Sequence, residues 1–194
     1  MMIFPLLFIF EDKSSAQNKQ SLPTGWDYGK VESYQGESIS ETNMLSQFNT
    51  YRNALLREDI NNFSEYIYND AIKYFKRFAP YNYSEKDIIK EFYKSVSGHL
   101  NSTIESFASR GISIDLVVQN IVRKITSGNT LIYVFNITMN IYNEKVSIHN
   151  SPEKTIGISF NNGTNWTFLA LNDDTPNILR MRFSQSIINQ IMGY

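Results

Sequence analysis

The spacing of apolar residues along this chain changes at Gly111, and the change separates two kinds of secondary structure. Before Gly111 the apolar residues recur at intervals of three and four, the period of an amphipathic helix. After Gly111 they alternate, the period of a half-buried strand. Helices followed by consecutive strands are typical of helices that cover one face of an antiparallel sheet. We therefore predict a single-domain α+β fold, with N-terminal helices packed on a curved antiparallel sheet.

Three helices are predicted before Gly111. The first begins near Ser40, and its apolar face is formed by Met44, Phe48, Tyr51, Leu55 and Leu56. Asp59 is the N-cap of a second helix, which ends before Pro80 and whose inner face holds Ile60, Phe63, Ile67 and Ala71. The third begins with a capping box over residues 84–87, in which Ser84 and Asp87 bond to each other's backbone, and it ends at Gly111.

The chain after Gly111 is predicted to form meandering strands. Apolar residues share one face from Ile112 to Val118 but have shifted by one position at Ile121, which indicates a β-bulge near residues 119–120. The clearest strand covers residues 131–141. A hairpin joins residues 154–160 to residues 166–171, and a short helix over 184–192 ends the domain.

Two segments are predicted ahead of the domain, which spans residues 39–194. Met1 to Phe10 is an apolar run, much shorter than the roughly 20 residues of a membrane-spanning helix. Small residues at positions 14 and 16 complete the pattern of an export signal over residues 1–16. Residues 17–38 are polar and rich in glycine, as in an irregular lead-in. We expect a secreted or periplasmic protein with no membrane span in the mature chain, or a cytoplasmic one if Met1 to Phe10 is retained.

Composition argues against several classes of function. The 18 basic and 19 acidic residues form no run of one sign that could follow a nucleic-acid backbone. The absence of cysteine removes thiol nucleophiles, disulfides and thiolate metal sites. The two histidines, His99 and His149, are not spaced as metal ligands with another such residue, and His149 is expected in a loop near Pro152. We expect no metal, no cofactor and no nucleic-acid partner.

A motif in the first two helices resembles one of the nuclear transport factor 2-like superfamily. Residues 51–59 read Tyr-Arg-Asn-Ala-Leu-Leu-Arg-Glu-Asp, and Phe63, Tyr66 and an Asn-Asp-Ala run at 69–71 follow. Members of the superfamily, among them ketosteroid isomerases and polyketide cyclases, carry a similar Tyr-x-x-Ala-Leu-x-x-Gly-Asp stretch and an Asp-Ala pair at the end of the second helix. The resemblance implies a cone-shaped, cystatin-like α+β domain from about residue 40 onward, of a kind that many bacteria export.

The resemblance also identifies positions that bear on catalysis. In the isomerases, the tyrosine that matches Tyr51 contributes to an oxyanion hole, and a carboxylate at the position of Phe75 removes a proton. A phenyl ring cannot accept a proton, so that reaction is not expected here. His99 and Asp115 are the alternative bases, although strand alternation turns Asp115 away from the apolar face. We predict a non-catalytic binding or interaction module; the alternative is a cyclase, dehydratase or isomerase with a displaced base.

Aromatic residues give the strongest indication of a ligand site. Members of the superfamily keep a pocket at the open end of the cone, and the residues expected to line it here are Tyr51, Tyr66, Tyr74, Phe75, Phe92, Tyr133 and Phe135. The ligand would be a small apolar molecule, unless the same rings form a packed core. The outer face of the sheet is predicted to carry Ile132, Val134 and Tyr142, an apolar surface that favours a homodimer formed through the sheet.

A second, local resemblance lies in the last hairpin. Residues 159–166 read Ser-Phe-Asn-Asn-Gly-Thr-Asn-Trp, which is similar to the Asp-box turn Ser-x-Asp-x-Gly-x-Thr-Trp of sialidase-type propellers. A single turn of this kind is a structural solution and implies no glycosidase chemistry. We expect Gly163 at the tip of the turn with a positive φ, and Trp166 packed beneath it.

Overall fold

The computed structural model describes residues 24–57, 59–94 and 110–194. Residues 85–94 are helical, and the other elements, in chain order, are β1 (Trp26–Tyr28), α1 (Ile39–Leu56), α2 (Ile60–Glu65), α3 (Asn69–Lys76), β2 (Ser113–Ser127), β3 (Thr130–Tyr142), β4 (Ser147–Asn150), β5 (Glu153–Ser159), β6 (Thr167–Ala170), α5 (Thr175–Leu179) and α6 (Gln185–Met192). The predicted α+β class is confirmed, because N-terminal helices precede an antiparallel sheet that is not closed into a barrel. The predicted export signal and His99 lie outside the described residues.

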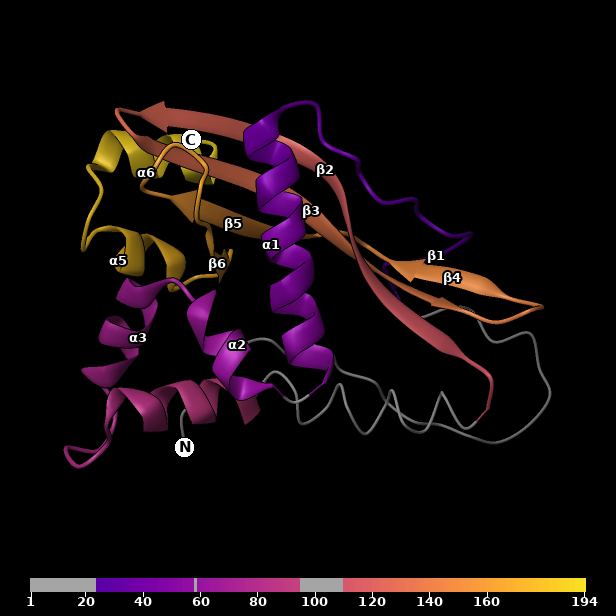
Figure 1. Ribbon diagram of the computed structural model, residues 1–194, viewed down its shortest axis with the longest axis horizontal. Helices are drawn as coiled ribbons and strands as arrows, with labels where there is room; N and C mark the ends of the chain where they lie inside the picture. The colour runs from indigo at the N-terminus through magenta and orange to yellow at the C-terminus, as the bar shows by residue number, and fades with distance from the viewer. Residues whose placement is uncertain (1–23, 58, 95–109) are drawn as a thin grey trace.

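The long strand β3 is the centre of the sheet (Figure 1). β2 pairs with one of its edges, while β5 and β4 follow one another along the other edge. β1 extends the sheet beyond β4, and β6 extends it beyond β5. The predicted bulge in β2 is confirmed, since the register with β3 shifts between Val118 and Asn120 and again between Ile121 and Arg123. Both long strands curve visibly along their length (Figure 1).

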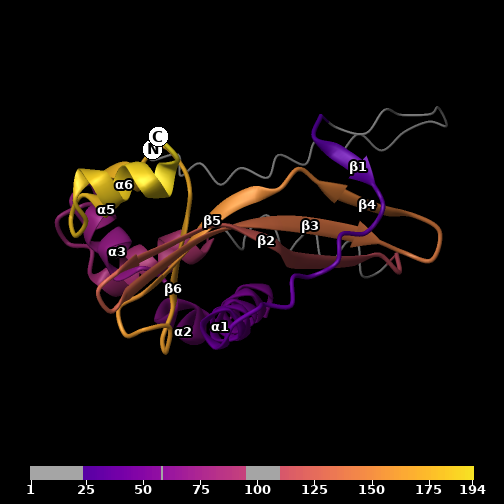
Figure 2. The ribbon, with the colours of Figure 1, turned by 90° about the horizontal axis from the view of Figure 1, so that it is seen from above.

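Helices cover both faces of this sheet (Figure 2). α1 crosses one face, where Met44 and Phe48 pack in one apolar cluster with Tyr133 and Phe135 of β3. α5 and α6 lie on the other side, and their apolar residues share a cluster with Ile132 and Val134 of β3. Successive residues of a strand point to opposite faces, so the single strand β3 supplies both clusters.

The prediction of an exposed apolar outer face is wrong at two of its three residues. Ile132 and Val134 are both 0% exposed, because the C-terminal helices cover them. Tyr142, the third residue, is half-buried, and the Lys30 ammonium lies 4.3 Å from the centre of its ring. Ile132 and Val134 are therefore not available as contacts of a homodimer formed through this face.

The predicted second helix is in fact two helices, α2 and α3. Between them Ile67 forms an isolated bridge to Phe168 of β6. The Phe168 N–H donates to the Tyr66 carbonyl at 2.7 Å, and the Tyr68 N–H donates to the Phe168 carbonyl at 3.1 Å. The chain leaves the helical conformation here because its backbone satisfies part of the open edge of β6.

The predicted irregular lead-in contains a strand. β1 pairs with β4, which places Trp26 opposite Asn150 and Asp27 opposite His149. His149 therefore lies in a strand, and the prediction of a loop there is wrong; its Nδ1 lies 2.8 Å from the Gly29 carbonyl oxygen. Strands of three and four residues show too few alternations to be recognised from sequence.

Two local motifs form as predicted. In the capping box, the Ser84 N–H donates to the Asp87 carboxylate at 2.7 Å, and the Asp87 N–H donates to the Ser84 Oγ at 3.2 Å. In the last hairpin, Gly163 has a φ of +81° and its N–H donates to the Ser159 Oγ at 2.9 Å. Trp166 is 1% exposed beneath the turn, where its Nε1–H donates to the Gly163 carbonyl at 3.0 Å.

Candidate functional site

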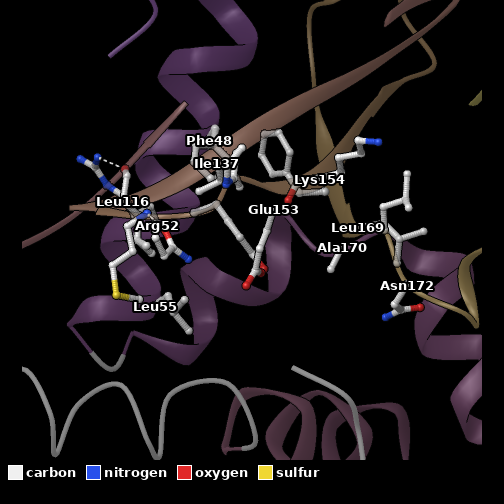
Figure 3. Close-up of a pocket in the computed structure, with 17 residues that line it drawn as sticks. Phe48, Arg52, Leu55, Leu116, Ile137, Glu153, Lys154, Leu169, Ala170 and Asn172 are labelled. Carbon is white, nitrogen blue, oxygen red and sulfur yellow. Dashed lines mark hydrogen bonds between the residues drawn. The ribbon is translucent and has the colours of Figure 1, made fainter. Parts of the chain in front are cut away.

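A pocket of about 490 Å³ lies between α1 and the sheet, near the point where β4 ends and β5 begins (Figure 3). Its volume is within the range of roughly 300–1,000 Å³ that is typical of small-molecule sites. The residues that line it are Phe48, Tyr51, Arg52, Leu55, Leu116, Ile137, Met139, Asn150, Pro152, Glu153, Lys154, Thr155, Phe168, Leu169, Ala170, Leu171 and Asn172.

The interruption between β4 and β5 shapes one wall of this pocket. Pro152 has no N–H and cannot continue the hydrogen-bond ladder along β3, so the strand is interrupted there. Beside the interruption, the side chain of Asn150 serves as an acceptor for β3, because its Oδ1 accepts from the Met139 N–H at 2.6 Å. Next in the chain, the Ser151 Oγ donates to the Gly25 carbonyl at 2.8 Å. The pairing resumes at Glu153, which lies opposite Ile137.

The inner wall of the pocket is formed by apolar side chains that pack closely on one another. Phe48, Met139 and Phe168 are buried, and Phe168 meets Phe48 edge-on with the ring centres 5.3 Å apart. These side chains come from α1, β3 and β6, so three separate elements hold the apolar surface in place. A surface of this kind suits the apolar part of a ligand.

Glu153 is the acidic residue that lines the pocket. It is exposed at the mouth, and Figure 3 shows its carboxylate on the side of the lining residues from α1. Among the described residues it makes neither a hydrogen bond nor an ion pair. Desolvation by the surrounding protein raises the pKa of this carboxyl above its ordinary value. An unpaired carboxyl of this kind in a pocket is a feature of functional sites.

Arg52, by contrast, already has partners on the far side of the pocket. Its guanidinium donates to the Asp115 carboxylate at 3.0 Å and to the Leu116 carbonyl at 2.7 Å. The side chains of Arg52 and Asp115 are 19% and 32% exposed, so this ion pair is partly shielded from water. Asp115, which alternation is predicted to turn away from the apolar face, is the counter-ion of a residue that lines the pocket.

Of the aromatic residues predicted to form the ligand site, Tyr51 alone lines this pocket. It stacks on Phe63 with the ring centres 5.0 Å apart, and its hydroxyl makes no hydrogen bond with the described residues. Burial raises the pKa of this phenol above its ordinary value, so the group stays protonated at neutral pH. It can therefore donate one hydrogen bond to a ligand.

The other six residues of the predicted site lie elsewhere. Phe135 is fully buried beneath α1, and the Tyr133 hydroxyl lies 2.8 Å from the Ser40 Oγ. Tyr66 packs on Phe168 outside the pocket. Away from the pocket, the structure brings together the three remaining rings, which are those of Tyr74, Phe75 and Phe92. Phe75, the position of the base in the isomerases, is thus a core residue and not a pocket residue.

Within the part of the chain that the structure describes, no group of three or more histidine, aspartate or glutamate residues is placed to hold a metal ion. The helices described there are also too short or too polar to cross a bilayer. Comparisons with known protein families, with curated proteins and with solved structures gave no match. The superfamily resemblance of residues 51–71 therefore stays a prediction.

Proposed function

We propose that this protein is an exported, non-catalytic binding module that holds a small, mainly apolar molecule between α1 and the sheet. The observation that carries the proposal is the pocket of about 490 Å³, whose buried interior is formed by apolar side chains such as Phe48, Met139 and Phe168. Pockets of this composition bind ligands by burying apolar surface, and a few polar groups fix the orientation. Here Glu153 and Tyr51 are among the polar residues that line the pocket.

Two features of the sequence support the rest of the proposal. The apolar run Met1 to Phe10 supports export, because it has the length of a signal-peptide core. The motif over residues 51–71 and the order of helices before strands support membership of the nuclear transport factor 2-like superfamily. In that superfamily the ligand site lies between the helices and the sheet, as the pocket does here.

Binding of the neutral dye Nile red, whose fluorescence rises in apolar surroundings, tests the proposal. We expect a saturable rise with the purified protein and competitive displacement by 1-octanol. Ala170→Trp should abolish binding, because Ala170 lines the pocket and an indole would occupy it. The matched control is Thr167→Trp, on the same strand but outside this pocket. Equal binding by the wild type and Ala170→Trp, with circular dichroism unchanged, would exclude the pocket as the site.

A second candidate function is an isomerase- or cyclase-type enzyme with a displaced base, and Glu153 is the observation that favours it. A carboxylate with a raised pKa, in a pocket also lined by a tyrosine, could remove a proton next to a carbonyl. Turnover of an unsaturated steroid ketone, lost in both Glu153→Gln and Tyr51→Phe, would establish this function and overturn the non-catalytic proposal. No turnover in the presence of tight ligand binding would exclude it for that substrate class.

A further inference from the structure

We infer that the pocket selects an amphipathic amine, with the apolar body of the ligand inside and its ammonium group at the mouth against Glu153. The inference rests on the proposed binding function and adds the chemical class of the ligand. It depends on how the charged groups around the pocket are arranged.

Three charged residues line the pocket, and Glu153 is the one whose charge remains available. The charge of Arg52 is balanced by Asp115, 3.0 Å away. Lys154 follows Glu153 in β5, so its side chain leaves the opposite face of the strand, and Figure 3 shows its amine pointing away from the pocket. A ligand in this pocket therefore meets one uncompensated charge, which is negative.

The position of Glu153 sets where the positive group of the ligand must lie. Glu153 is exposed at the mouth, whereas Phe48, Met139 and Phe168 form a buried apolar interior. A ligand that fills the interior displaces water from around the carboxylate, which is unfavourable unless a new partner replaces that water. An ammonium group is such a partner, because a charge-assisted hydrogen bond is about twice as strong as a neutral one. The raised pKa of Glu153 agrees with a carboxyl that lacks a cation.

An anionic ligand such as a fatty acid fits the same pocket less well. It would place a second negative charge near Glu153, or it would have to take Arg52 from Asp115 and from the Leu116 carbonyl. Although the Nε of Arg52 is buried without a hydrogen-bond partner among the described residues, the positive charge of the guanidinium is already balanced by Asp115. Charge complementarity thus favours the amine over the acid.

Displacement of Nile red by three ligands with the same eight-carbon chain, octylamine, 1-octanol and octanoate, tests the inference near neutral pH. With the wild type we expect octylamine to displace the dye at a concentration about tenfold lower than 1-octanol, and octanoate to be weakest. In Glu153→Gln, octylamine and 1-octanol should agree within about twofold, because the glutamine lacks the charge. In the control Lys154→Gln the tenfold preference should persist, because that amine points away from the pocket.

The outcomes separate this inference from the proposal beneath it. The inference is overturned alone if the dye binds but 1-octanol or octanoate competes as well as octylamine, or if Glu153→Gln keeps the amine preference. If neither the dye nor any of the three ligands binds, both the binding function and the amine selectivity are overturned. Glu153 is exposed and its carboxylate makes no hydrogen bond with the described residues, so its replacement by glutamine should leave the fold intact; an unchanged melting temperature checks this.

Discussion

The side-chain oxygen of Asn150 accepts a hydrogen bond from the backbone N–H of Met139 at 2.6 Å. This bond occupies a place in the sheet that a backbone carbonyl would fill if β4 and β5 were one strand. It lets the strand break at Pro152 without leaving a buried donor unpaired, and the break is where the pocket opens. A single asparagine thus couples the stability of the sheet to the shape of the candidate site.

Asn150→Ala should lower the free energy of unfolding by about 1–3 kcal/mol, because it leaves the Met139 N–H buried without a partner. Urea denaturation followed by circular dichroism measures this change. The control is Asn177→Ala, since Asn177 is exposed and, among the described residues, its side chain accepts only from the exposed side chain of Arg180. It should alter the stability by less than about 0.5 kcal/mol. Equal effects of the two substitutions would contradict the role given to Asn150.

Glu41 anchors the segment before α1 and should make stability depend on acid pH. It is 3% exposed and accepts hydrogen bonds from Tyr34 at 2.6 Å and from Lys124 at 2.8 Å. Burial on its own would raise the pKa of Glu41, but these bonds outweigh it and lower the pKa from 4.5 to about 2. The ionised form is thus favoured in the folded state, so its contribution is complete above pH 4.5 and is lost as the pH falls toward 2.

Glu41→Gln should therefore be less stable than the wild type by about 2 kcal/mol near neutral pH, and the gap should close as the pH falls. Urea denaturation of both proteins at a series of pH values measures the gap. A difference that stays constant from neutral pH down to pH 2 would show that the ionised carboxylate is not what holds this segment.

Gly163 should tolerate alanine much less well than Gly128 does, although both have a positive φ. A Cβ on Gly163 would lie 2.7 Å from the Cβ of Ser40, whereas a Cβ on Gly128 would have no neighbour within 4 Å. Gly128→Ala should lose about 1–2 kcal/mol from the left-handed backbone alone, and Gly163→Ala should lose at least about 1 kcal/mol more. Thermal unfolding of the two variants compares them, and similar losses would contradict the close packing of α1 on the hairpin.

Asp115→Asn should increase the affinity of the pocket for anionic ligands, although Asp115 is not one of the residues that line it. The substitution removes the counter-ion of Arg52, whose positive charge then becomes available to a bound anion. Octanoate should displace Nile red at a concentration about two- to fivefold lower than with the wild type, in line with the 0.2–1 kcal/mol of a partly exposed ion pair. If octanoate binding does not change, the Arg52 charge does not reach the pocket.

Those parts of the fold that depend on local sequence could be predicted. The shift of apolar phase near residue 120 marked the bulge in β2, and the spacing around Gly163 marked the turn of the hairpin. The separation of α2 from α3 could not be predicted, because Ile67 is buried whether it lies in a helix or against β6. The burial of Ile132 and Val134 could not be predicted either. It depends on where α6 packs, and the alternation of residues within β3 does not determine that position.

The candidate site was harder to predict than the fold. An aromatic residue looks the same in a sequence whether it fills a core, as Phe135 does, or lines a pocket, as Tyr51 does. Glu153 was missed because its role comes from the strand break beside it and from α1 across the pocket. The one local signal was Pro152 directly before a charged residue at the start of a predicted strand.

Carbon-13 labelling of the methionine methyl groups provides the most direct test of the central claim that a small apolar molecule binds between α1 and the sheet. Met139 lines the pocket, whereas Met44, one helical turn before Phe48 in α1, is buried in an apolar cluster and does not line the pocket. Addition of octylamine or 1-octanol should shift the Met139 methyl resonance saturably, leave that of Met44 in place, and have no such effect in Ala170→Trp. Equal shifts of both methyl groups, or no saturable shift of Met139 with either ligand, would contradict the claim.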